Sequence, residues 1–155
     1  MNKRFFALLL ALALILSLVP STAFAAGDGL HFEYASDADG QLYAVVTGYT
    51  GTASELTIPS EIGGHVVKSI GESAFQSCKT LKSVKLPDSL TELGKFAFFN
   101  CTGLTSATLP ASVTSVGANA FNACSGLTHV TIPACVISGN STADKVGTFP
   151  YCFPK

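Results

Sequence analysis

The chain has 155 residues, and its 9 lysines and arginines against 10 aspartates and glutamates give a formal net charge of −1. This length suits a single domain, and the balance of charge provides no basic surface for nucleic acid or anionic lipid. With no tryptophan and three histidines, the chain also has few of the side chains from which active sites are usually built.

The first 25 residues have the three parts of a secretory signal peptide. Lys3 and Arg4 form a positive start, an apolar run follows over 5–19, and Ala23-Phe24-Ala25 offers the small-x-small pattern that a signal peptidase needs. An uncleaved anchor is less favoured, because the run is shorter than the roughly 20 residues that cross a bilayer. We therefore expect a signal peptide over 1–25 and no membrane span after its removal. Losing Lys3 and Arg4 leaves 7 basic and 10 acidic residues, a net charge of −3.

Residues 26–53 are expected to form an N-terminal β cap. Two apolar stretches flank Asp37-Ala38-Asp39-Gly40, a hairpin signature that requires positive φ at Gly40. The spacing of the two aspartates also resembles the start of a calcium loop. Gly48 stands where an EF-hand needs a glutamate, so the turn is favoured over a metal site.

A repeat with a period of 23 residues fills the rest of the chain. Two units are five residues longer, with insertions near Gly63-Gly64-His65 and within 138–144, and the last unit carries Phe149 and Cys152. This divides 54–155 into four repeats, 54–80, 81–103, 104–126 and 127–154. The columns that keep the period are Leu81, Leu104 and Leu127; Pro87, Pro110 and Pro133; Gly94 and Gly117; Phe75, Phe98 and Phe121; Cys78, Cys101 and Cys124.

The pattern within one unit predicts its shape. Apolar residues alternate with polar ones up to the proline, as around Val84-Lys85-Leu86, which indicates a short strand. Leu90 and Leu93 form a second inward stretch, Gly94 turns the chain, and Ala97-Phe98 belong to a helical or 3₁₀ turn. One unit cannot bury these side chains alone, whereas stacked units bury them against each other. The sequence therefore predicts a solenoid.

The repeat resembles that of the BspA-like leucine-rich-repeat surface proteins, whose unit is close to L-x-x-I-x-I-P-x-x-V-x-x-I-G-x-x-A-F-x-x-C. The matching segments are LKSVKLPDSLTELGKFAFFNC (81–101) and LTSATLPASVTSVGANAFNAC (104–124). The resemblance covers about 50–135 well and 136–155 loosely. It implies a leucine-rich-repeat solenoid with one parallel sheet face and short helical or 3₁₀ turns on the other. It also implies an exported protein that works by binding.

Four of the five cysteines follow the repeat, at positions 78, 101, 124 and 152. Stacked equivalents point their Cβ atoms in parallel about 4.8 Å apart, whereas a disulfide needs Cβ atoms about 3.8 Å apart that face each other. We therefore predict buried free thiols. Cys135 lies outside the column, and a bridge from it to Cys152 is a less favoured alternative. No cysteine and histidine spacing indicates zinc.

The outward positions beside the predicted strand are the best candidate for a binding surface on the concave side of the solenoid. Partner-binding residues are predicted at Lys82, Lys85, Thr105, Thr108, Thr128, His129 and Thr131. The alternative is that threonine and serine simply suit exposed strands. The three columns are Ser54, Lys82, Thr105 and Thr128; Glu55, Ser83, Ser106 and His129; Thr57, Lys85, Thr108 and Thr131.

These observations favour a secreted or cell-surface binding module of adhesin type, with a protein or glycan ligand on a host or bacterial surface. The alternatives are a structural spacer, a fragment of a longer array, or an accessory domain beside a catalytic partner, because no cell-wall sorting signal follows the last unit. We expect no enzymatic activity, no cofactor, no metal and no nucleic-acid partner.

Overall fold

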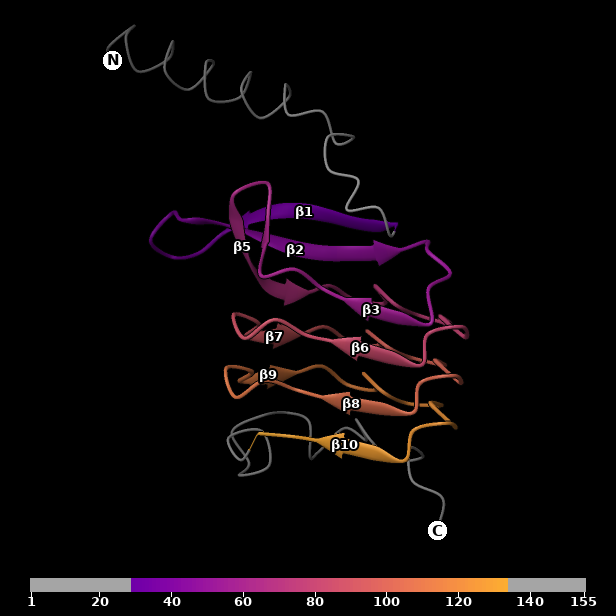
Figure 1. The fold of residues 1–155 in the computed structure, drawn as a ribbon. Helices are drawn as coiled ribbons and strands as arrows, with labels where there is room; N and C mark the ends of the chain where they lie inside the picture. Colours follow the sequence, from indigo (N-terminus) through magenta and orange to yellow (C-terminus); the bar gives the residue numbers. More distant parts are fainter. Residues whose placement is uncertain (1–28, 134–155) are drawn as a thin grey trace, which may run out of the picture.

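The computed structural model of the protein describes residues 29–133, which form strands and turns without a helix. These residues make a stack of chain turns with a β-hairpin at its N-terminal end (Figure 1). The described part therefore holds no apolar helix of membrane-spanning length. The predicted signal peptide, the 138–144 insertion, Cys135, Phe149 and Cys152 lie outside the described residues.

The strands form two sheets. One has six strands in the order β1-β2-β5-β7-β9, with β4 paired to β5, and the other has the parallel order β10-β8-β6-β3. In chain order the strands are β1 (Leu30–Ser36), β2 (Leu42–Tyr49), β3 (Glu55–Thr57), β4 (Glu61–Ile62), β5 (His65–Ile70), β6 (Ser83–Lys85), β7 (Glu92–Leu93), β8 (Ser106–Thr108), β9 (Ser115–Val116) and β10 (His129–Thr131).

The strand predicted before each proline is confirmed, and it makes the four-stranded sheet. The second inward stretch was not expected to form a sheet, yet it supplies the two-residue strands β7 and β9, which continue from β5 in parallel. In β7 the outward Glu92 is exposed and the inward Leu93 is buried. The solenoid therefore has two sheet faces instead of the single one predicted.

The third side of each repeat consists of turns with 3₁₀-type hydrogen bonds, and no regular helix forms among the described residues. Around Phe75 the amides of Ala74, Gln76 and Cys78 each donate to the carbonyl three residues earlier. Ser73 and Ser77 have φ of 59° and 61°, and such left-handed residues interrupt a helix.

These turns stack through a ladder of their own. The N–H groups of Ser73, Phe75 and Ser77 donate to the carbonyls of Lys95, Ala97 and Phe99 in the next repeat, at 2.9, 2.7 and 2.8 Å. All three sides of the solenoid are thus joined by hydrogen bonds between repeats.

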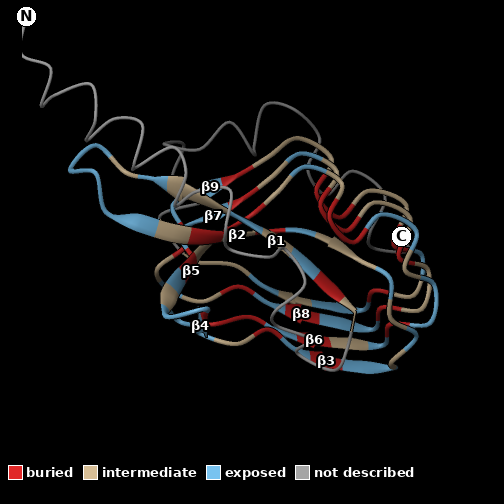
Figure 2. Ribbon diagram, turned by 90° about the horizontal axis from the view of Figure 1, so that it is seen from above, coloured by how far each residue is buried: buried red, intermediate tan, exposed pale blue. Residues whose placement is uncertain are grey.

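The core runs along the inside of the stack, where Figure 2 shows the buried segments. Leucine, phenylalanine and alanine of successive repeats occupy it, and Phe75, Phe98 and Phe121 are 0 % exposed. Each repeat packs mainly on its two neighbours, so stability is approximately a sum of such interfaces.

Two of the cysteines that follow the repeat confirm the prediction of buried free thiols. Cys101 and Cys124 are buried and unbridged, and their Sγ atoms donate to the carbonyls of Phe75 and Phe98 at 2.9 and 3.0 Å. Cys78 is also free but only half-buried. Contact with the Cys124 and Cys78 thiols, together with burial, raises the pKa of the Cys101 thiol.

The predicted hairpin cap is present. Strands β1 and β2 pair antiparallel, and Gly40 has the positive φ expected of its turn, 76°. The insertion near Gly63-Gly64 forms the turn between β4 and β5, with φ of 59° and 80°. The ring of Tyr34 lies edge-on against His65 with centroids 4.7 Å apart, so the insertion packs against the cap.

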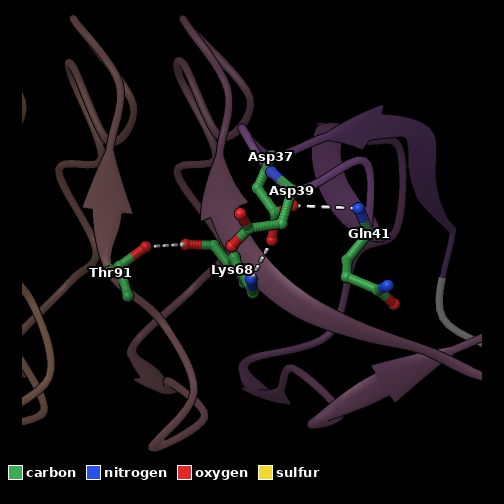
Figure 3. A network of polar contacts seen from close by, with 5 residues as sticks. All are labelled: Asp37, Asp39, Gln41, Lys68 and Thr91. Carbon is green, nitrogen blue, oxygen red and sulfur yellow. Dashed lines mark hydrogen bonds and ion pairs between the residues drawn. The ribbon is translucent and has the colours of Figure 1, made fainter.

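The hairpin tip is fastened to the first repeat by Asp37 (Figure 3). Its carboxylate accepts the backbone amides of Asp39 and Gln41 at 3.1 and 2.9 Å and forms an ion pair with Lys68 at 3.0 Å. These bonds lower the pKa of the Asp37 carboxyl, and the bond from Lys68 has the largest effect. The two-aspartate spacing therefore serves a turn, as predicted.

Candidate binding surface

The strand face, defined as the outward side chains of the four-stranded sheet, brings two predicted columns into line. The strand register pairs Glu55 with Ser83, Ser106 and His129 in one row across the repeats. It pairs Thr57 with Lys85, Thr108 and Thr131 in the next row. All of these residues are exposed except the half-buried Ser83. Periodicity alone therefore placed these side chains correctly.

The third predicted column lies just ahead of the strands and has a structural role. Both the amide and the hydroxyl of Thr105 donate to the carbonyl of Lys82, at 3.0 and 3.1 Å. Thr128 donates in the same way to the carbonyl of Thr105, at 3.0 and 3.1 Å. These two hydroxyls join one repeat to the next. For these threonines, a structural role is therefore favoured over partner binding.

Lys85, together with Lys82 just ahead of β6, gives the strand face its basic character. Both are exposed, and among the described residues the one ion pair joins Lys68 to Asp37 at the cap. Glu55 is the acidic residue of the same face, in the neighbouring repeat. The ammonium groups of the two lysines are thus available to a partner.

His129 shows no arrangement typical of catalysis. Its Nδ1 atom lies 2.9 Å from the Thr128 hydroxyl, and its ring is exposed on β10. Within 29–133, no three histidine, cysteine or acidic side chains gather closely enough to hold a metal ion.

A hollow at the ends of β3 and β6 was missed by the sequence reasoning. It has a volume of about 220 Å³ and adjoins Lys85 of the strand face. The prolines that follow the two strands begin the loops around it. These prolines were the feature of the sequence from which the hollow could have been predicted. Its lining residues are Thr57, Ile58, Ser60, Lys85, Leu86, Pro87 and Asp88.

Comparison with known families accounts for this arrangement. Residues 49–143 match the family described as "BspA type Leucine rich repeat region (6 copies)". The chain belongs to this family. The resemblance inferred from the repeat is therefore confirmed, as is the solenoid. Among curated proteins, no sequence matches the chain.

Two solved structures with leucine-rich repeats are similar to this BspA-type solenoid. The leucine-rich-repeat protein TpLRR of T. pallidum has 31 % identity and a TM-score of 0.61, over 66 % of this chain and 47 % of that one. A leucine-rich cell surface protein of Faecalibacterium prausnitzii A2-165 has 36 % identity and a TM-score of 0.56, over 63 % of this chain and 28 % of that one. The chain thus spans about half or less of the length of these relatives.

Proposed function

We propose that this chain is an exported binding module that holds a protein or glycan of a host or bacterial surface against its strand face. Membership of the BspA-type family supports a role in protein interaction and an extracellular or surface location. The relative from Faecalibacterium is itself a cell surface protein, and the predicted signal peptide agrees with export.

One observation carries the proposal. Two rows of outward side chains run in register across four repeats, and these side chains lie outside the core. Repeat solenoids use such extended surfaces to bind partners. Because the rows carry hydroxyls and Lys85, with Lys82 just ahead of them, they suit a polar ligand with negative charge better than an apolar one.

The same face gives no support to catalysis, so the proposal includes a non-enzymatic role. The alternative is a structural spacer with no partner of its own. The hydroxyls of Thr105 and Thr128 favour that alternative at their own positions, because they are used between repeats. The two exposed lysines favour the binding function, since no described residue pairs with either of them.

The test is to screen the secreted chain against immobilised matrix proteins and a glycan array, and then to repeat each positive with Lys82→Glu/Lys85→Glu. Exposed lysines contribute little to folding, so this double variant should fold normally. It should bind more weakly and lose the salt sensitivity of the native chain.

The matched control compares Lys85→Glu with Lys95→Glu, an equal change of charge at an exposed residue of the turn side. Lys95→Glu should leave binding unchanged. Equal losses of binding in Lys85→Glu and Lys95→Glu would rule out the strand face as the binding site. Unchanged affinity of the double variant at low salt would also rule it out.

A further inference from the structure

The N-terminal cap closes one sheet of the solenoid and leaves the other open. Strand β2 pairs with β5 and thereby covers the first edge of the six-stranded sheet, whereas the four-stranded sheet ends at β3. Figure 2, which looks down on the cap, shows β1 and β2 crossing over the end of the stack. No described strand pairs with the outer edge of β3.

The hydrogen-bond pattern identifies the free groups on that edge. The carbonyl of Ser54 accepts the amide of Lys82 at 2.7 Å, and the amide of Ile58 donates to the carbonyl of Lys85 at 3.0 Å. Alternate residues of a parallel strand bond to the same neighbour, so Glu55 and Thr57 direct their N–H and C=O groups away from β6. Among the described residues these groups have no partner.

An open edge is a template for another strand. Strand β1 is also an edge, but its register shifts between His31 and Phe32, and such bulges protect edges. Strand β3 keeps a continuous register from Glu55 to Thr57. Of these two edges, β3 is therefore the one with an uninterrupted register, although at three residues it is the shorter strand.

We propose that β3 accepts an extended segment of a partner protein as an additional strand, with an acidic side chain opposite Thr57. This inference rests on the proposed function and names the kind of partner. Lys85 lies beside Thr57 in the register, about 10 Å from the added strand at two strand spacings. A long acidic side chain and the lysine side chain together span that distance on the same face.

The hollow next to Thr57 can accommodate the acidic group of the partner. Thr57, Ser60 and Lys85 are among its lining residues, and their side chains carry two hydroxyls and an ammonium. Asp88 on its lining repels a carboxylate, so the acid should lie toward Lys85. Opposite Glu55 the partner should carry a neutral or basic residue, since like charges directly opposite destabilise a sheet.

The probe is a short synthetic peptide of alternating threonine and valine with one central glutamate, and its control has lysine at the same place. Each is titrated into the isotope-labelled secreted chain, and backbone amide signals are followed by NMR. The glutamate peptide should shift the Glu55 and Thr57 amides and slow their hydrogen exchange. The lysine peptide should bind about tenfold more weakly.

Two variants at one position separate strand addition from other modes of binding. Thr57→Pro removes an N–H that makes no bond within the described fold, a change that edge strands tolerate, and it should abolish binding. Thr57→Val keeps the N–H and should retain it. Lys85→Glu should reverse the preference between the two peptides.

Several outcomes would overturn this inference. One is native affinity in a Thr57→Pro variant whose amide spectrum shows a folded chain. Another is the absence of shifts at Glu55 and Thr57 with the glutamate peptide, a measurement on the native chain that needs no variant. If matrix or glycan binding still depends on Lys82 and Lys85 in that case, the proposed function stands and only the strand addition fails.

Discussion

The ring of Phe98 lies parallel to that of Phe75, with centroids 4.8 Å apart and planes inclined by 5°, although 23 residues separate them. Phe121 continues the stack at 5.3 Å and 4°. The ring of Tyr49 from the cap lies 5.7 Å from Phe75 at a tilt of 38°. One aromatic column therefore joins the cap to three repeats.

Replacing Phe98 by alanine should cost about 3–5 kcal/mol of the free energy of unfolding, the range for an emptied core aromatic. The ring is 0 % exposed and has a stacked neighbour on each side. Denaturant unfolding of the chain measures the loss. Phe99→Ala, at a half-buried position of the same turn, is the control and should cost clearly less. A midpoint that hardly moves for Phe98→Ala would contradict the role of the column.

The period made these columns predictable. When the same residue returns every 23 positions, stacking brings the copies together, and the identity of one column member predicts the neighbours of the next. For this reason the inward Phe98, the buried Cys101 and the outward Thr108 were all placed correctly from the sequence.

The parts that the sequence did not predict depend on backbone geometry. A two-residue strand such as β7 is too short to show alternation, so Leu93 predicted burial but no sheet. Phe96 has φ of 55°, unusual for a bulky residue, and nothing in its side chain indicated a non-helical turn. The bonds of the Thr105 and Thr128 hydroxyls depend on where neighbouring carbonyls lie. The open edge of β3 follows from the place where the cap pairs.

The thiols offer a second test of the stacking. In the native chain an alkylating reagent should leave Cys101 and Cys124 unmodified, because both are buried and the raised pKa of Cys101 keeps that thiol protonated. Cys78 is half-buried and should react slowly. Peptide mapping by mass spectrometry before and after denaturation locates the label. A disulfide between any two of these three cysteines would contradict the parallel column.

The ion pair at the cap predicts a dependence on pH. Because the Asp37 pKa is lowered on folding, its contribution to stability is present above the unfolded pKa of about 3.9 and is lost as the pH falls through the folded value. The melting temperature of the native chain should exceed that of Asp37→Asn by a constant amount at neutral pH, and the difference should shrink below about pH 4.

The asparagine of this variant can still accept the turn amides, so the comparison isolates the charge. Asp39→Asn is the control, since that residue donates to the Asp37 carboxylate through its backbone amide and not through its side chain. A difference between native chain and Asp37→Asn that stays constant down to pH 2 would show that the pair with Lys68 contributes nothing.

The glycine that follows each short strand of the six-stranded sheet is required by the close approach of neighbouring repeats. A Cβ atom on Gly94 would lie 2.6 Å from the carbonyl carbon of Gly71 and 2.7 Å from the amide nitrogen of Glu72. Both are backbone atoms, which cannot move aside as a side-chain end can. Gly117 faces the same obstacle, the backbone nitrogen of Lys95. The column is therefore glycine because no side chain fits between the turns.

Gly94→Ala should destabilise the chain by about 1–3 kcal/mol, the usual cost of overpacking a well-packed interior. Gly48→Ala is the matched control, since its Cβ would meet only the His31 side chain at an ordinary 3.6 Å. Neither glycine has positive φ, so the comparison tests space and not backbone conformation. Thermal unfolding of both variants measures the difference. Equal stability of the two would mean that the repeats separate locally at little cost, and stacking at this position would then be looser than the contacts between Gly71 and Gly94 indicate.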